Sequence, residues 1–219
     1  MSDIQDLNIL QNEAIDGGQF RDVRLFAETT IKDALSCETL NVYEKATFHG
    51  PVKAKKIKVT DQAVFHGPVM ALEIEIEGTA TFLGPVKCNH FKVKNQITAY
   101  EKVEAYESEF FGMATFKEFD GFKLTNHGYL RSDERLRCNH ITFTQSGRGK
   151  LHEVFSAIVK IASENVLKDG NPRVTIHQLV AYDVTLKHTH IGRLEAKVIN
   201  KDEETTIHDL RVIGLNNGT

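Results

Sequence analysis

A heptapeptide that recurs at one fixed, short interval is the strongest constraint on the fold of this chain. Residues 46–52 read ATFHGPV, residues 63–69 read AVFHGPV and residues 80–86 read ATFLGPV. Repetition at a short fixed period indicates a stack of equivalent units, none of which buries its apolar face alone. Seventeen residues, the length of this period, are too few for a helix-turn-helix repeat or a propeller blade. They suit one coil of a β-helix, in which three short strands and three turns form a rung.

A second pattern follows each copy and extends the repeat in both directions. It consists of a small or apolar residue, two free positions, an apolar residue, one free position and an apolar residue, as in Ala54-Ile57-Val59. This apolar skeleton begins at positions 20, 37, 54, 71, 88, 105, 121 and 138, so the spacing is 17 with one interval of 16. We therefore predict eight rungs over residues 12–147, with residues 1–11 as an N-terminal tail or cap.

Polar and turn residues also recur, and each recurrence predicts a column in the stack. Two outward columns mostly alternate in charge, which disfavours a slip of one rung; they hold Lys58, Glu75, Lys92 and Glu109, and Lys56, Glu73, His90 and Glu107. Glycine followed by proline suits a sharp corner; these glycines are Gly50, Gly67 and Gly84. A third column of phenylalanines is expected to stack inward, namely Phe48, Phe65 and Phe82.

The pattern changes in residues 148–172. Helical spacing predicts a linker and then one inserted amphipathic α-helix over 151–167; its apolar positions are Leu151, Val154, Phe155, Ile158, Ile161, Ala162 and Val166. The sequence KDGNP ends it at residues 168–172. We expect this helix to pack against the solenoid, or else to bind a partner protein or a membrane surface. Leu151, Phe155 and Ile158 are the candidate partner-binding residues.

Strand-like sequence resumes in residues 173–219. TIHQL at Thr175 recurs as TIHDL at Thr206. The apolar skeleton returns three times at spacings of 15 and 16, as Ile176-Leu179-Ala181, Ile191-Leu194-Ala196 and Ile207-Leu210-Val212. We predict three further coils and about eleven rungs in all. A separate small α+β domain from residue 150 onward is the alternative.

The composition narrows the class of protein. The chain has 219 residues, is 41% hydrophobic and 26% charged, and has a formal net charge of −3, so it lacks the basic character of a nucleic-acid-binding protein. No apolar stretch approaches the ~20 residues of a membrane-spanning helix, and the N-terminus does not resemble a signal peptide. Membrane association is left open, but nothing in the sequence indicates it. Three widely spaced cysteines favour a reducing cytoplasm over disulfides.

Candidate chemical sites are weak, and we predict no catalytic residue, cofactor or metal. His49 and His66 occupy equivalent positions on adjacent rungs, but the repeat supplies no third ligand. His188 and His190 share a strand face without a recognisable cysteine or carboxylate pattern nearby. The chain contains no nucleophile elbow, P-loop or dinucleotide fingerprint. The three cysteines, Cys37, Cys88 and Cys138, occupy the position of Ala54 and are expected in the core.

The two ends of such a stack are the places where association with another chain is expected. A terminal rung exposes unpaired backbone groups and a slice of core, which is a template for another chain. We therefore expect end-to-end self-association, with a homo-oligomer or filament as the product. The residues expected at the two ends are Phe20, Val23 and Leu25, and Ile207, Leu210 and Val212.

Residues 46–93 resemble the bactofilins, a family of polymer-forming bacterial cytoskeletal proteins. The residues that carry the resemblance are a turn glycine, an aliphatic residue, a small residue and two spaced aliphatics, here Gly50, Val52, Ala54, Ile57 and Val59. The resemblance implies an all-β, right-handed, single-stranded β-helix that polymerises end to end without nucleotide as a cytoplasmic or membrane-associated scaffold. The alternatives are an adaptor that binds a protein through the inserted helix, and a β-helical enzyme.

Overall fold

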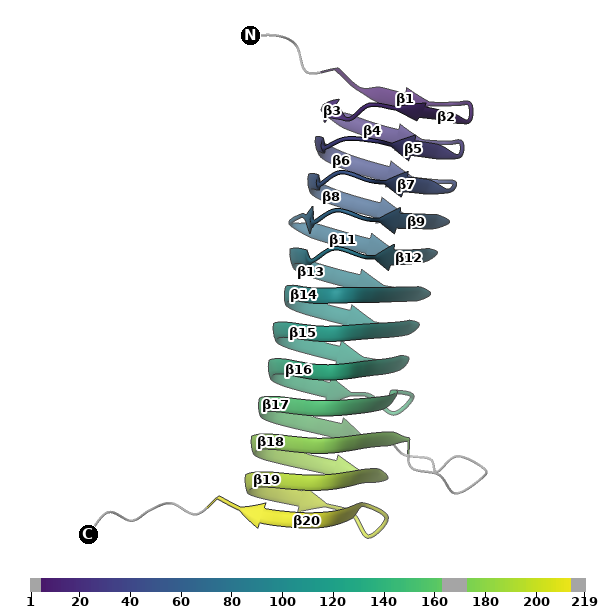
Figure 1. The fold of residues 1–219 in the computed structure, drawn as a ribbon. Helices are drawn as coiled ribbons and strands as arrows, with labels where there is room; N and C mark the ends of the chain where they lie inside the picture. The colour runs from purple at the N-terminus through teal and green to yellow at the C-terminus, as the bar shows by residue number, and fades with distance from the viewer. Residues whose placement is uncertain (1–4, 163–172, 214–219) are drawn as a thin grey trace, which may run out of the picture.

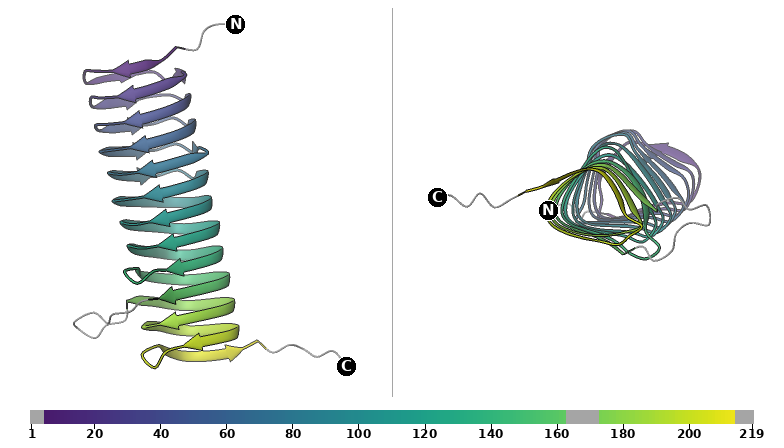
Figure 2. Two further views of the ribbon diagram at one scale, coloured as in Figure 1. Left: turned by 180° about the vertical axis from the view of Figure 1, so that it is seen from behind. Right: turned by 90° about the horizontal axis from the view of Figure 1, so that it is seen from below.

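Twenty strands, every one paired in parallel with its neighbours, wind into one column in the computed structural model, which describes residues 5–162 and 173–213 (Figure 1). The column is an all-β solenoid of about 12 turns, with β1 at one end and β20 at the other. A view along the axis shows the turns stacked over one another (Figure 2). The β-solenoid predicted from the heptapeptide repeat is therefore confirmed.

Strand length divides the column into two halves. The N-terminal half has short strands: β1 (Leu7–Ile9), β2 (Glu13–Ile15), β3 (Gly18–Gln19), β4 (Asp22–Leu25), β5 (Thr29–Ile31), β6 (Leu35–Val42), β7 (Ala46–Phe48), β8 (Val52–Val59), β9 (Gln62–Phe65), β10 (Val69–Met70), β11 (Glu73–Ile76), β12 (Thr79–Phe82) and β13 (Val86–Val93). Longer strands follow: β14 (Gln96–Phe110), β15 (Met113–Asn126), β16 (Tyr129–Phe143), β17 (Arg148–Ala162), β18 (Val174–Lys187), β19 (Thr189–Lys201) and β20 (Thr206–Val212).

The apolar skeleton sets the register of the first block of the repeat, which comprises the eight rungs predicted over residues 12–147. Ile57 pairs with Ile74, which pairs in turn with Phe91, so residues one repeat apart lie one above the other. Burial alternates along each strand because side chains point to opposite faces, and β11 reads exposed, buried, intermediate, buried. The single shorter interval appears as a register shift between β14 and β15. The stacking predicted for the skeletons from positions 20 to 138 is confirmed.

The phenylalanine column lies in the core, as predicted. Phe48, Phe65 and Phe82 have no exposed surface. Their ring centroids are 4.7 and 4.9 Å apart, and the ring planes are nearly parallel at 6° and 8°. These distances match the ~4.8 Å spacing of adjacent strands. The aromatic stack is therefore a direct consequence of in-register turns.

The stacked glycines are needed for a different reason from the one expected. A Cβ on Gly67 would lie 2.6 Å from the backbone of Gly50, and one on Gly84 would lie 2.7 Å from the backbone of Gly67. Among the described glycines only Gly18 has a positive φ. Glycine recurs at this corner because successive backbones approach too closely for a side chain, and not because the turn requires a left-handed conformation.

The two charge columns are confirmed by the strand register, which places Glu75 between Lys58 and Lys92. Some ion pairs run straight up a column, as Lys92 does to Glu109 at 3.6 Å. Others run diagonally: the Lys58 ammonium lies 3.1 Å from Glu77. Such exposed pairs contribute little individually, so their main effect is to penalise a slipped register.

The inserted α-helix is wrong for the described part of its predicted range. Residues 148–162 form β17, which pairs in parallel with β16 and β18. Residues 163–167 of the predicted helix lie outside the described residues. The predicted linker at 148–150 is also part of β17.

Corners of the solenoid explain why the sequence has a helical spacing here. Inward positions within a side of the turn are two residues apart, but across a corner they are three apart, as from Leu151 to Val154. The partly buried Phe155 and Ile158 occupy further positions of the helical pattern. Ser156, which pairs with Cys138, begins another copy of the apolar skeleton. Because serine is polar, this copy does not match the sequence pattern, and the pattern misses a complete turn.

The C-terminal strands continue the same column. Ile176 pairs with Ile191, which pairs with Ile207, so the three later skeletons stack as predicted. These later skeletons do not occupy the same positions of the turn as the skeletons that begin at residues 20 to 138. The position of Cys138 continues through Ser156 to Ala181, whereas the later skeleton begins at Ile176. No helix occurs in residues 173–213, and the alternative α+β domain is therefore wrong for that segment.

Candidate self-association surfaces at the two ends

The C-terminal end of the column has an unpaired strand edge. β20 pairs with β19, and within the described residues no strand pairs with its other edge. In a parallel ladder, alternate residues direct their N–H and C=O groups to opposite neighbours. About half of the backbone groups of β20 therefore point away from the column and are open to another strand.

The same end leaves part of the core uncovered. Leu194 and Ala196 are fully buried, yet the residues above them in β20, Leu210 and Val212, are 51% and 60% exposed. Ile213 is 42% exposed and Ile207 is partly buried. The three residues predicted for this end thus occupy inward-facing columns whose last members contact only one neighbouring turn.

The residues predicted for the N-terminal end lie one turn inside it. Val23 and Leu25 have no exposed surface, because β1 pairs over them and places Leu7 and Ile9 above. Phe20 is partly buried. β1, β2 and β3 form the actual terminal turn, so the first turn begins within the segment expected to be a tail or cap. The sequence signal that identifies this turn is one more copy of the skeleton, Ile4-Leu7-Ile9, at nearly the usual interval before Phe20.

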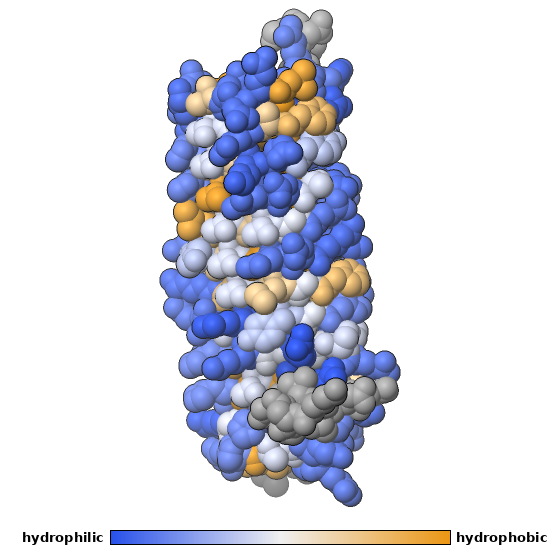
Figure 3. Space-filling model, turned by 90° about the vertical axis from the view of Figure 1, so that its right-hand side faces the viewer, coloured by the Kyte–Doolittle hydropathy of each residue, from blue (hydrophilic) through white to orange (hydrophobic). Residues whose placement is uncertain are grey.

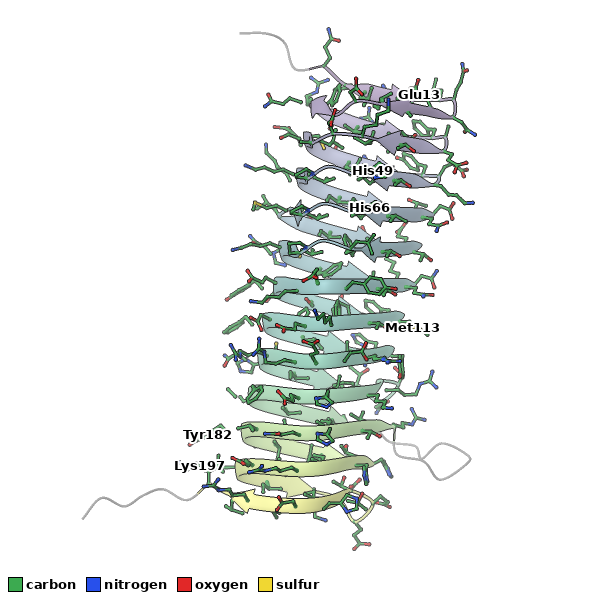
Figure 4. All side chains as sticks on the ribbon, viewed as in Figure 1. Glu13, His49, His66, Met113, Tyr182 and Lys197 are labelled. Carbon is green, nitrogen blue, oxygen red and sulfur yellow. The ribbon has the colours of Figure 1, made fainter. Side chains whose placement is uncertain are left out.

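A charged residue distinguishes the N-terminal end from the C-terminal one. Glu13, labelled in Figure 4, pairs with Thr29, whose inward-facing side chain is only 1% exposed. Glu13 itself is exposed. A carboxylate at an inward position of an edge strand discourages pairing with another edge. The C-terminal end, where Leu210 and Val212 occupy inward positions, is therefore the less protected of the two.

The predicted partner-binding residues do not form one surface. Leu151 is 2% exposed and belongs to the core, whereas Phe155 and Ile158 are only partly buried. The guanidinium of Arg137 lies 5.9 Å from the Phe155 ring centroid, one turn away. These three residues belong to a strand and not to a helix, so they do not form the helical binding face that the sequence predicted.

Polar residues predominate on the side of the column that is shown in Figure 3. Apolar residues occur there in separate patches. His49 and His66 lie on consecutive turns with ring centroids 4.7 Å apart (Figure 4). Tyr182 and Lys197 are paired in the same way, with a hydrogen bond of 3.0 Å from Nζ to the phenol oxygen.

The cysteines lack the surroundings of a reactive thiol. Cys88 and Cys138 are buried and Cys37 is partly buried, and all three are free. Burial raises the pKa of each thiol to about 12, so the nucleophilic thiolate is disfavoured. Their position in the alanine column fits a packing role, as the sequence pattern predicted.

Comparison with known proteins does not place the chain in a family. No protein-family model, no curated protein and no solved structure matches it. Within the described segments, no helix has the length and hydrophobicity needed to cross a membrane.

Proposed function

We propose that this protein is a non-enzymatic structural scaffold that self-associates end to end through the termini of its solenoid, as a bactofilin-like cytoskeletal element. The observation that carries the proposal is the C-terminal end, where Leu210 and Val212 continue buried columns but remain more than half exposed. The unpaired edge of β20 lies at the same place. Both features are satisfied together when another terminal turn stacks on this one.

The driving forces come from the repeat itself. An interior turn buries its inward residues between two neighbours, whereas the last turn has one neighbour in the described structure. A second copy supplies the missing apolar contacts and the missing backbone hydrogen bonds. Neither of these interactions requires a nucleotide, and we accordingly propose nucleotide-independent assembly.

The charge pattern on the sides favours contact through the ends. Opposite charges alternate up the column and pair within the chain, as in Lys56 to Glu73 at 3.2 Å and Lys87 to Glu104 at 3.5 Å. Side-by-side contact would require these charged and hydrated surfaces to lose water. The three free cysteines fit a reducing compartment, and we propose a cytoplasmic location.

The adaptor alternative has no comparable support. It depended on an apolar helix over 151–167, whose described part is a core strand. We therefore propose self-association in preference to binding of a second protein through that segment.

Sedimentation velocity and negative-stain electron microscopy of the full chain over a range of concentrations test the proposal. We expect rods of a single column width whose lengths are multiples of one chain and increase with concentration. Particles of one chain length at every concentration, or bundles joined only along their sides, would contradict end-to-end assembly.

A further inference from the structure

Three side chains with metal-binding atoms converge at one corner of the column near its C-terminal end. His188 lies between β18 and β19, and Asp202 and Glu204 lie between β19 and β20. One ligand atom from each lies within 4.8 Å of the others. The two carboxylates follow His188 in the sequence by about one turn of this part of the solenoid. Successive turns therefore bring distant residues to the same corner.

Hydrogen bonds hold Asp202 in a fixed orientation. The backbone N–H of His188 donates to Oδ1 and Oδ2 of Asp202 at 3.3 and 3.1 Å. The Thr205 hydroxyl donates to Oδ1 at 2.6 Å. These three hydrogen bonds orient the Asp202 carboxylate toward the corner that it shares with His188.

His188 is held in an uncommon conformation with an unused ring nitrogen. Its φ is 48°, and it is the single non-glycine residue with a positive φ in the described parts of the chain. Positive φ is uncommon for residues other than glycine, although histidine adopts it more readily than most. Nδ1 of His188 is buried and has no hydrogen-bond partner in the structure. This buried nitrogen has the lone pair or proton of the imidazole free, so it is available to a ligand at this corner.

We propose that His188, Asp202 and Glu204 bind one divalent transition metal ion, with Zn²⁺ as the best match. One imidazole and two carboxylates are a donor set that zinc accepts. Ca²⁺ and Mg²⁺ prefer all-oxygen sites. Tetrahedral bonds of about 2.0–2.2 Å bring donor atoms to roughly 3.3–3.6 Å apart. The exposed Glu204 has the freedom to close the remaining distance, and a water molecule completes the four ligands.

Metal binding at this corner would clamp the last turn. His188 belongs to the corner above, and the two carboxylates belong to the turn that leads into β20. An ion shared between them joins two successive turns where the backbone pairing is interrupted. This inference does not depend on end-to-end assembly and holds equally for a monomeric column.

Titration of the chelator-treated full chain with Zn²⁺, by calorimetry and by competition with a chromophoric chelator, tests the site. His188→Asn removes the imidazole and keeps a residue that tolerates positive φ. Glu204→Gln changes an exposed side chain and leaves the fold intact. His208→Ala is the matched control, because it removes an exposed histidine outside the cluster.

We expect one Zn²⁺ per chain, at least a tenfold loss of affinity in each cluster variant, and no change in the control. Zn²⁺ should raise the Tm of the wild type and the control but not that of Glu204→Gln. Absence of zinc binding by the wild type overturns the proposal. So does binding that both cluster variants retain, since it would report adventitious sites among the other histidines.

Discussion

Replacing the two most exposed apolar residues of β20 with lysine provides the sharpest test of end-to-end association. Leu210 and Val212 are 51% and 60% exposed at the C-terminal end. Complete burial of such a side chain is worth about 1.5–3 kcal/mol. Covering the exposed half of each therefore contributes about 0.8–1.5 kcal/mol, or about 1.5–3 kcal/mol for the pair. At about 1.4 kcal/mol per factor of ten, the double variant should associate roughly 10- to 150-fold more weakly.

The calculated loss of association is a lower limit, because lysine adds a charge that must lose water when the two ends meet. The assay is sedimentation velocity of wild type and variant over at least three decades of concentration, fitted for the dissociation constant. Circular dichroism and urea denaturation of the variant establish that the column is still folded. Lysine is also a residue that natural edge strands use to prevent pairing.

Leu72→Lys is the matched control for the double variant. Leu72 is 52% exposed, almost the same as Leu210, but it lies on the side of the column in the middle of the repeat. Leu72→Lys should change the association constant by no more than a factor of about three relative to the wild type. Equal weakening by both changes would mean that assembly uses the sides, and no weakening by the double variant would refute association through β20.

The remaining predictions concern the core, the N-terminal edge and pH. Phe65→Ala should lower the free energy of unfolding by about 3–5 kcal/mol in urea denaturation, because Phe65 is fully buried between two stacked rings; Phe65→Leu should cost less than half as much. Glu13→Thr should strengthen association measured by sedimentation, because it removes an exposed charge from an inward-facing position; weaker association would contradict the protective role. Hydrogen bonds from Lys94 lower the pKa of Glu75 and Glu77, so their stabilisation is present above the ordinary value of 4.5 and is lost as pH falls through the folded-state pKa. Lys94→Gln should therefore reduce the Tm at pH 6 more than at pH 3, and an equal effect at both would rule out the ion pairs as the cause.

The first block could be predicted closely because its information is repeated. Ala54 has a counterpart in Cys37, and Ile57 and Val59 have counterparts one repeat away in both directions. In a parallel stack, equivalent positions lie directly above one another, so a sequence period translates into a register without further assumptions. Even the weak copies at Ser108 and Leu124 are in register, because buried neighbours impose the backbone path on them.

The failures occur where a single turn departs from that repeated pattern. Ser156 replaces the small apolar residue, and the corner between Leu151 and Val154 adds a step of three to a pattern of two. Local periodicity cannot distinguish this combination from a helix face. The N-terminal turn escapes prediction for a related reason: Leu7 and Ile9 continue the skeleton at a slightly shorter interval, in a segment with no heptapeptide copy.

The departures also indicate where chemistry specific to this chain is to be found. A residue selected for stacking resembles its neighbours one turn away, as Phe48 resembles Phe65. His188 and Asp202 have no such counterparts in the repeat; each lies at a corner where the strand pairing stops. The cluster that they form with Glu204 precedes β20 directly and so adjoins the turn that leaves the core uncovered. A stack of equivalent turns specifies a rigid column and little else. We therefore expect its individual function to depend on the last turns, where the repeat has decayed and, among the described residues, one edge is unpaired.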